Sequence, residues 1–305
     1  MTSGSWLARV ALGATLFTAL VASCVPPEDV EAPVVRRTPR SSKPFDPFGR
    51  GDAGEPAFAC SDTETGFDAF MMDFGSYAVS RHVSPHTVES ALGLVAYDPA
   101  VIALDRSQSA FKVTFEEFYA KHVTTSRITR GRALLQSEAP LFARIEARFG
   151  VPGPVLAAIW GLETEYGRNT GSMSCFRALA TLAYDCRRAE RFRGELLAAL
   201  RIVDRGDLPP EAMRGAWAGE LGQTQFLPSS YEKYALDFDG DHRADLIGSS
   251  ADALASTAHY LEGHGWKAHE GFEPGSANFE VLGEWNASEK YRRTIVAFAK
   301  KLRGK

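Results

Sequence analysis

Hydrophobic residues recur at intervals of three and four along most of the chain after residue 56, and this spacing predicts helices. Phe67, Phe70 and Phe74 fall on one face of a first helix, and Ser84 followed by Pro85 is typical of the start of a second. The same spacing predicts further helices over 126–149, which Pro140 should divide, near 192–203, near 254–261 and from 288 to 302.

Alternating strand patterns are nearly absent from the chain, and we find no internal repeat. The best candidate for a strand is the segment Asn278–Leu282. A chain of 305 residues is long enough to bury a sizeable core. We therefore expect a mainly α fold with at most a small strand pair.

The first residues have the pattern of a secretion signal. A single cation, Arg9, precedes an apolar run from Val10 to Ala22, and about 13 residues are too few to cross a bilayer as a helix. The run ends in Val21-Ala22-Ser23-Cys24, which resembles a bacterial lipobox, where a peptidase cuts before the cysteine and its thiol receives a lipid. A plain secretory signal is the alternative.

The sequence therefore predicts three parts: a lipoprotein signal peptide over 1–23, a lipidated Cys24 with a proline-rich tether over 24–56, and a folded domain over 57–305. Many prolines and few hydrophobic residues predict that the tether is disordered. The residue after the cysteine is Val25 and not an aspartate, and this pattern resembles lipoproteins of the outer membrane. We expect the domain to be anchored there, on the periplasmic side.

Composition excludes some classes of protein. Hydrophobic residues make up 45% of the chain and charged residues 24%, as in soluble globular proteins, and the net charge of −4 gives no support to nucleic-acid binding. An exported domain lies in an oxidising compartment, where cysteines form disulfides. Cys175 and Cys186 flank a short segment and are the favoured pair, although the sequence leaves pairing with Cys60 open.

One acid lies where hydrophobic residues are expected. In the apolar helical segment 151–167, a rotation of about 100° per residue places Glu163 inside the apolar face and Glu165 on the opposite face. A carboxyl group on an apolar face is ion-paired, hydrogen-bonded or held with a raised pKa, and a raised pKa suits a general acid near neutral pH. The alternative is a structural ion pair of Glu163 with Arg187 or Arg188.

Several sequence segments stand around Glu163 in one order: 151–168 with Gly161–Gly167 at its centre, Ala178–Tyr184, Arg187–Glu190, Trp217–Tyr231, His259–Tyr260, His264–Trp266 and Trp285–Ser288. Together they resemble the lytic murein transglycosylase B family, glycoside hydrolase family 103, over about residues 60–303. The resemblance implies a mainly α, lysozyme-like α+β domain. It also implies a glycan-binding groove and cleavage of peptidoglycan without consumption of water.

The resemblance implies roles for individual residues. Glu163 matches the sole catalytic acid of the family. Aromatic rings stack against the faces of sugars, and amide groups can bind N-acetyl groups. For each aromatic residue, packing in the core is the alternative. The positions that match the glycan groove of the family are Gln225, Tyr260, Trp285, Asn286 and Tyr291.

The number of acids bears on the reaction. Hydrolytic glycosidases commonly use two carboxyl groups, one on each side of the bond, whereas one acid stands out here. The resemblance implies that Glu163 acts first as acid and then as base on the bond between N-acetylmuramic acid and N-acetylglucosamine, leaving a 1,6-anhydromuramoyl end. We expect a monomer that acts on glycan strands with no cofactor for catalysis. A hydrolytic muramidase and a wall-binding lipoprotein without turnover stay open as alternatives.

An Asp-rich segment has the spacing of a calcium-binding loop. Oxygen ligands at alternating positions suit a hard cation, for which we expect a structural role. His242 stands in place of the glycine of an EF-hand loop, and Gly248 in place of its glutamate. A turn that holds no metal is the alternative. The candidate ligands are Asp237, Asp239, Asp241, Asp245 and, from farther along the chain, Asp252.

Overall fold

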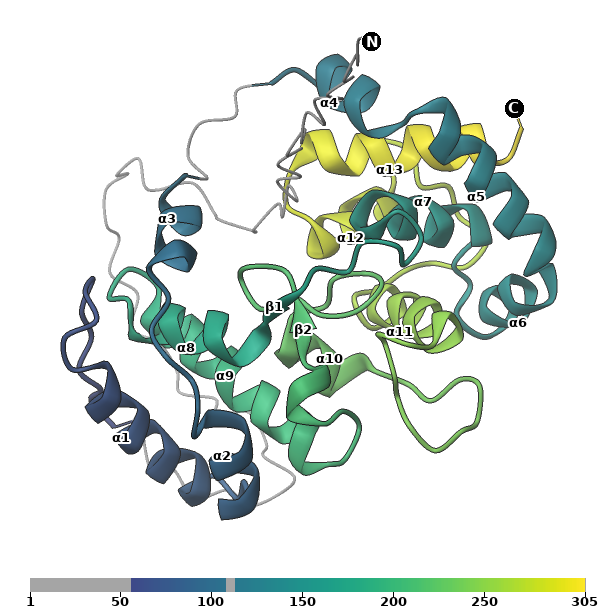
Figure 1. Cartoon of the computed structure of the whole chain (residues 1–305). Coiled ribbons are helices and arrows are strands. Elements are labelled where there is room, and N and C mark those ends of the chain that lie inside the picture. The colour runs from purple at the N-terminus through teal and green to yellow at the C-terminus, as the bar shows by residue number, and fades with distance from the viewer. Residues whose placement is uncertain (1–55, 108–112, 305) are drawn as a thin grey trace, which may run out of the picture.

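The computed structural model describes residues 56–107 and 113–304, and this part of the chain is mainly helical, as the sequence predicts (Figure 1). The elements that enclose a first hydrophobic core are α1 (Phe67–Ser80), α2 (Pro85–Leu92), α3 (Pro99–Ser107), β1 (Met173–Ser174), α8 (Cys175–Tyr184), α9 (Ala189–Asp204), the 3-10 turn η2 (Pro210–Ala212), β2 (Arg214–Gly215) and α10 (Pro228–Tyr234). Those around a second core are α4 (Phe115–His122), α5 (Thr125–Ser137), α6 (Ala139–Phe149), α7 (Gly153–Thr164), α11 (Ser250–Gly263), α12 (Ala277–Trp285) and α13 (Glu289–Leu302).

The two hydrophobic cores meet at a boundary that we call the seam. Tyr260 of α11 and Trp285 at the end of α12 are partly buried and pack against both cores. Phe226, from the loop before α10, lies against both rings, with centroids 6.0 and 5.4 Å away. The seam is thus formed by segments that are far apart in the sequence.

Local sequence signals set the ends of several helices. Ser84 caps α2, because its hydroxyl accepts a hydrogen bond from the backbone N–H three residues on, and Pro85 takes the first helical position. Residues 126–149 form two helices, as the proline in this segment predicts. Pro140 stands in the first turn of α6, and helical geometry is interrupted at Glu138 between α5 and α6.

The predicted strand at Asn278–Leu282 is wrong, because this segment lies within helix α12. The Ser276 hydroxyl caps the helix, and the buried residues of the segment follow helical spacing. The Asn278 side chain is buried and hydrogen-bonded to backbone groups. The strand pattern assumed that this polar residue faces water, and that assumption led to the error. The described residues instead form one small antiparallel sheet, in which Met173 of β1 lies opposite Gly215 of β2.

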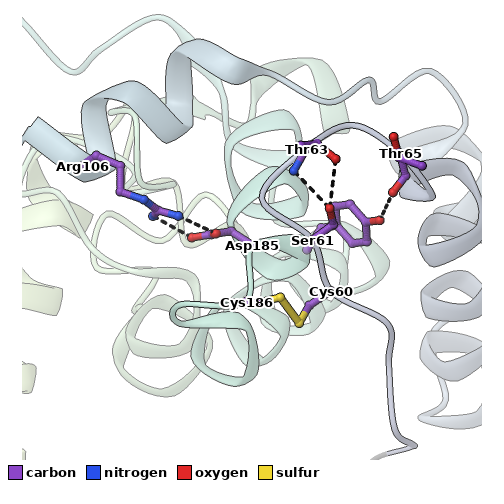
Figure 2. Close-up of a disulfide and its surroundings, with 8 residues drawn as sticks. Cys60, Ser61, Thr63, Thr65, Arg106, Asp185 and Cys186 are labelled. Carbon is purple, nitrogen blue, oxygen red and sulfur yellow. Dashed lines mark hydrogen bonds and ion pairs between the residues drawn. A yellow bond between two sulfur atoms is a disulfide. The ribbon is translucent and has the colours of Figure 1, made fainter.

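The disulfide joins Cys60 to Cys186 (Figure 2), so the predicted pair of Cys175 with Cys186 is wrong. Cys175 begins α8 and Cys186 follows its end. A helix of that length separates them by about 16 Å, whereas a disulfide requires Cα atoms within about 7 Å. The Cys175 thiol is buried and faces the Gly219 carbonyl at 3.3 Å. The bridge connects the start of the described domain to the turn between α8 and α9.

An ion-pair cluster beside the disulfide holds α3 against the same turn. Asp105 is buried and pairs with Arg106, Arg187 and Arg188. Arg106 also donates two hydrogen bonds of 2.7 and 2.9 Å to the carboxylate of Asp185 (Figure 2). A buried carboxylate requires such partners, because an unpaired buried charge is strongly destabilising.

Some predictions fall outside the part of the chain that the structure describes. These are the signal peptide 1–23, Cys24 as lipidation site, and the tether 24–56 apart from Pro56. Among the described helices, none has the length and apolar character needed to cross a bilayer.

We expect Cys175 to be the free thiol of the domain. A full-length Cys24→Ser chain, unfolded without reductant, alkylated and mapped by mass spectrometry, should carry the label on Cys175 while Cys60 and Cys186 stay linked. Replacing both linked cysteines by serine should lower the free energy of unfolding by about 2–5 kcal/mol, because the bridge closes a long loop. A label on Cys60 would contradict this pairing.

Candidate active site

Helix α7 carries Glu163 to the seam. The helix is buried along most of its length, so its neighbours in the second core fix its position. Thr164, the last helical residue, donates its hydroxyl hydrogen bond to the Gln223 carbonyl and accepts one of 2.9 Å from Gly167 N–H. These bonds connect the end of α7 to the segment Trp217–Tyr231 and hold Glu163 beside it.

Two aromatic side chains contact the carboxyl group of Glu163. The Tyr291 hydroxyl, from the first turn of α13, donates a hydrogen bond to Oε1, and the Trp285 indole N–H donates to the same oxygen at 3.3 Å. Both of these hydrogen bonds go to Oε1, and within the described residues Oε2 accepts none. Burial and the neighbouring Glu163 raise the pKa of Tyr291 well above its usual value, so Tyr291 stays a donor.

The pKa of Glu163 is raised to about 7. The largest cause is burial, because the loss of water penalises the charged carboxylate, and the nearby Glu220 carboxyl acts in the same direction. The hydrogen bonds from Tyr291 and Trp285 favour the carboxylate and lower the pKa. Acid and carboxylate forms therefore coexist near neutral pH, as a group that both gives and takes a proton requires.

Glu220 is a second buried acid close to Glu163, and the sequence analysis missed it. Its side chain is buried, burial raises its pKa to about 7, and Oε2 accepts a hydrogen bond of 3.2 Å from Ala218 N–H. It lies in an irregular loop, where no periodicity predicts which residues are buried. The one signal in the sequence is an acid among the small and hydrophobic residues of Trp217–Tyr231.

The predicted groove aromatics gather at the seam. Trp285 and Tyr291 contact Glu163 and also pack in the cores, so the two interpretations of these residues are compatible. Tyr260 packs edge-on against Trp285, with ring centroids 5.2 Å apart. Together with the buried Phe226, which sequence analysis did not single out, they form an aromatic cluster at the seam, next to the acid.

The amides of Gln225 and Asn286 hold the backbone around the seam. Gln225 has a left-handed backbone with φ 58°, and its amide donates to the carbonyls of Thr170 at 3.1 Å and Gly222 at 2.9 Å. Asn286 is buried, and its Oδ1 accepts a hydrogen bond of 2.9 Å from Ser288 N–H at the start of α13. Their contacts with N-acetyl groups stay predictions.

The structure does not form the alternative ion pair of Glu163. Arg187 and Arg188 both pair with Asp105 instead. The Glu165 side chain is 47% exposed and pairs with Arg127 of α5. Its predicted place on the opposite helical face is wrong, because α7 ends at Thr164 and Glu165 has a left-handed backbone. Among the described residues no cation pairs with Glu163, so burial remains the largest influence on its pKa.

Three of the five predicted calcium ligands lie together. Carboxylate oxygens of Asp237, Asp239 and Asp252 are within 4.8 Å of one another, and hard oxygen donors of this kind suit calcium. Asp241 and Asp245 are outside this group, and their carboxylates accept hydrogen bonds from backbone N–H groups of the loop. Burial raises the pKa of Asp252.

Comparison with known proteins identifies the class. The family model described as the transglycosylase SLT domain matches residues 66–275, and the chain belongs to this family. Over 147 residues the chain is 37% identical to the membrane-bound lytic murein transglycosylase B of Escherichia coli, a match that covers 48% of this chain. The match covers 40% of the length of that relative, so this chain spans about two fifths of it.

Solved structures agree with this family. SltB3 from Pseudomonas aeruginosa superimposes with a TM-score of 0.75 and 30% identity, over 79% of this chain and 80% of that chain, and its structures hold NAG-anhNAM-pentapeptide or NAG-NAM-pentapeptide. Soluble lytic transglycosylase SltB1 from the same organism superimposes with a TM-score of 0.72 and 26% identity, over 77% of this chain and 99% of that chain. The predicted family and fold class are confirmed.

We expect the Glu163 carboxyl to titrate with a pKa of about 7. A carboxyl-carbon NMR titration, assigned with Glu163→Gln, measures this value directly. In Tyr291→Phe the pKa should rise further, because a hydrogen bond that favours the carboxylate is lost. Tyr97→Phe removes a tyrosine hydroxyl that donates to Asp62 and should leave the Glu163 pKa unchanged. A value near the ordinary 4.5 would contradict the structure.

Proposed function

We propose that this chain is a lytic transglycosylase that cleaves peptidoglycan between N-acetylmuramic acid and N-acetylglucosamine. The observation that carries the proposal is the Glu163 carboxyl, held at the seam by Tyr291 and Trp285 with a pKa of about 7. Membership of the transglycosylase SLT family supports it. So do the complexes of SltB3 with NAG-anhNAM-pentapeptide and NAG-NAM-pentapeptide.

In the first half of the reaction, the Glu163 acid gives its proton to the oxygen that bridges the two sugars. The bond from muramoyl C1 to that oxygen breaks, and the N-acetylglucosamine residue leaves with a hydroxyl group. The muramoyl N-acetyl oxygen stabilises the positive charge that develops at C1. Hydrogen bonds from Tyr291 and Trp285 to Oε1 stabilise the carboxylate that forms on Glu163.

In the second half, the same carboxylate takes the proton from the muramoyl C6 hydroxyl. The C6 oxygen attacks C1 and closes a 1,6-anhydro ring, and Glu163 returns to its acid form. One group serves both steps without a net change of protons, which matches a pKa near the working pH. No cofactor takes part in this sequence.

A hydrolytic muramidase is the second candidate, and Glu220 is the observation that favours it. Hydrolytic glycosidases use a second carboxyl group to activate water or to form a covalent intermediate, and Glu220 is a second buried carboxyl near Glu163. Muropeptide mass spectrometry separates the two, because anhydro ends indicate the transglycosylase and reducing ends the muramidase. Binding of sacculi without release of fragments would indicate a wall-binding protein.

We expect Glu163→Gln to lose at least about 10²–10⁴-fold of its activity on purified sacculi, because the amide keeps the shape but cannot transfer the proton. Wild-type turnover should fall as the pH rises through about 7, where the acid form is lost. Glu195→Gln is the matched control, since it changes a buried carboxyl that accepts hydrogen bonds from Ser229 and, among the described residues, makes none with Glu163. Retention of more than about a tenth of the activity by Glu163→Gln would contradict the assignment.

We also propose that a lipid on Cys24 anchors the monomeric enzyme to the periplasmic face of the outer membrane. The lipobox-like sequence Val21–Cys24 and the proline-rich segment after it support this. The relative from Escherichia coli is described as membrane-bound. A single acyl chain binds only weakly, so firm anchoring requires more than one chain.

Cys24→Ala should therefore yield an active enzyme in the wrong place. Cells that express it should release it into the soluble periplasmic fraction, while wild type sediments with outer membranes after a salt wash. Activity of the purified variant on sacculi should equal that of wild type, because the domain folds separately from the anchor. Continued sedimentation of Cys24→Ala with outer membranes would overturn the anchor.

We further propose that Asp237, Asp239 and Asp252 would hold a calcium ion with a structural role. Three carboxylate oxygens within 4.8 Å fit the ion, which would add positive charge between acids that otherwise repel one another. The ion would connect the loop before Asp241 to the first turn of α11, which carries Asp252. None of these residues contacts Glu163 in the described structure.

Calcium should raise the melting temperature without changing turnover at temperatures where the chain is folded. A ligand that binds only the folded state at a hundredfold excess over Kd stabilises by about 2.7 kcal/mol. Asp237→Asn combined with Asp239→Asn should abolish the shift, whereas Asp241→Asn, outside the group, should keep it. Equal melting curves for wild type in chelator and in excess calcium would refute the site.

A further inference from the structure

The chain directly after Glu163 has an unusual backbone. Glu165, Tyr166 and Gly167 are consecutive residues with left-handed backbone angles, φ 54°, 64° and 77°. Glycine adopts this conformation readily, whereas the two residues before it do so only at a cost in free energy. Such a turn persists only where contacts around it require it, and strained residues of this kind cluster at functional sites.

One residue, Arg127 of α5, contacts both strained side chains. Its guanidinium Nη2 lies 2.6 Å from Oε1 of Glu165, and its backbone carbonyl accepts a hydrogen bond of 2.7 Å from the Tyr166 hydroxyl. The side chain of Arg127 is only 14% exposed, so this ion pair is partly shielded from water. Side chain and backbone of one residue thus hold the turn from two directions.

The space around Tyr166 shows how closely this turn is packed. A Cβ atom on Gly131 of α5 would lie 2.3 Å from the Tyr166 hydroxyl, and one on Gly161 of α7 would lie 2.8 Å from its ring. The ring is buried and packs edge-on against Trp160, with centroids 5.5 Å apart. Tyr166 therefore fills the space between two helices that only glycines leave open.

Arg127 also connects this turn to the other side of Glu163. Its Nη1 donates a hydrogen bond to the carbonyl of His122 at the end of α4. Phe118 of α4 packs against the ring of Tyr291, with centroids 6.2 Å apart, and Tyr291 is the residue that donates to Glu163. The guanidinium therefore constrains both the backbone that follows Glu163 and the helix that supports its hydrogen-bond donor.

We propose that Arg127 is a positioning residue for Glu163: by holding the left-handed turn at Glu165 and Tyr166 and the end of α4, it keeps the Glu163 carboxyl against Tyr291 and shielded from water. It does not itself touch substrate. The proposal deepens the proposed function and rests on it for the role of Glu163. A displacement of about 1 Å at a reacting group can cost about 10²-fold in rate.

The test compares Arg127→Met with Arg132→Met in the full-length chain. Arg132, on the same helix, donates to the Lys301 carbonyl at 2.7 and 3.1 Å, so both variants lose an arginine and its bonds to a backbone carbonyl. At a temperature where both are folded, Arg127→Met should lower kcat on sacculi at least about tenfold with little change in KM. Its Glu163 pKa should fall towards the ordinary value, because burial is the largest influence on this pKa and its loss should outweigh the loss of the Tyr291 hydrogen bond. The alkaline limb of the pH profile should therefore move to lower pH. Arg132→Met should change neither.

Two further variants keep the test decisive. Arg127→Lys retains the charge but cannot bond Glu165 and His122 with one planar group, so its kcat and Glu163 pKa should lie between those of wild type and Arg127→Met. If Arg127→Met does not fold, Glu165→Gln removes the ion pair from its exposed side. Its kcat and its Glu163 pKa are then measured instead. A Glu163 pKa and kcat equal to those of Arg132→Met would overturn the proposal. Absence of turnover in wild type would refute the proposed function instead, while the pKa comparison by NMR would still test Arg127.

Discussion

A half-buried carboxyl group at the boundary between two hydrophobic cores, with a pKa raised by the loss of water around it, is the constraint on which the rest of this structure depends. Between about pH 4.5 and 7 the Glu163 carboxyl ionises in the unfolded chain but holds its proton in the folded one, so folding becomes less favourable as the pH rises. A difference of between two and three pKa units corresponds to about 3 kcal/mol. The burial of α7 within the second core and the hydrogen bonds to Oε1 must offset that cost.

The elements around Glu163 come from three distant parts of the chain. Helix α7 supplies the acid, the loop before α10 supplies Phe226 and Glu220, and the junction of α12 and α13 supplies Trp285 and Tyr291. Because the donors to Oε1 stand on a different helix from the acid, the hydrogen bonds form only when the second core is assembled. Correct geometry at the acid is therefore coupled to correct packing of the domain.

Glu163 could be found from the sequence because helical periodicity states which face of a regular element is buried, and an acid on that face stands out. The division at Pro140 and the cap at Ser84 were predictable for similar local reasons. Glu220 lies in an irregular loop, where burial depends on contacts that no spacing encodes.

Other errors arise because sequence patterns do not show tertiary contacts. Cys175 and Cys186 are close in sequence, but the rigid helix between them keeps them apart, whereas Cys60 is brought to Cys186 by folding. The segment Asn278–Leu282 has the alternation of a strand only if its polar residues face water. Asn278 is buried, so the alternation is not real and the segment is helical. Chain proximity and residue type thus did not reveal which residues tertiary packing buries or brings together.

The Cys60–Cys186 bridge also determines how mechanical load travels through the domain. A pull on the chain N-terminal to Cys60 passes through the covalent bridge to the turn between α8 and α9 and bypasses the loop that the bridge closes, over a sequence separation of 126. Helices α1 to α8, which lie inside that loop, carry none of the tension and cannot be unwound from their N-terminal end. The load path continues along the chain from Cys186 and through the packing of α9. Tension applied N-terminal to Cys60 would thus reach Cys186 without unwinding α7, the helix that carries Glu163.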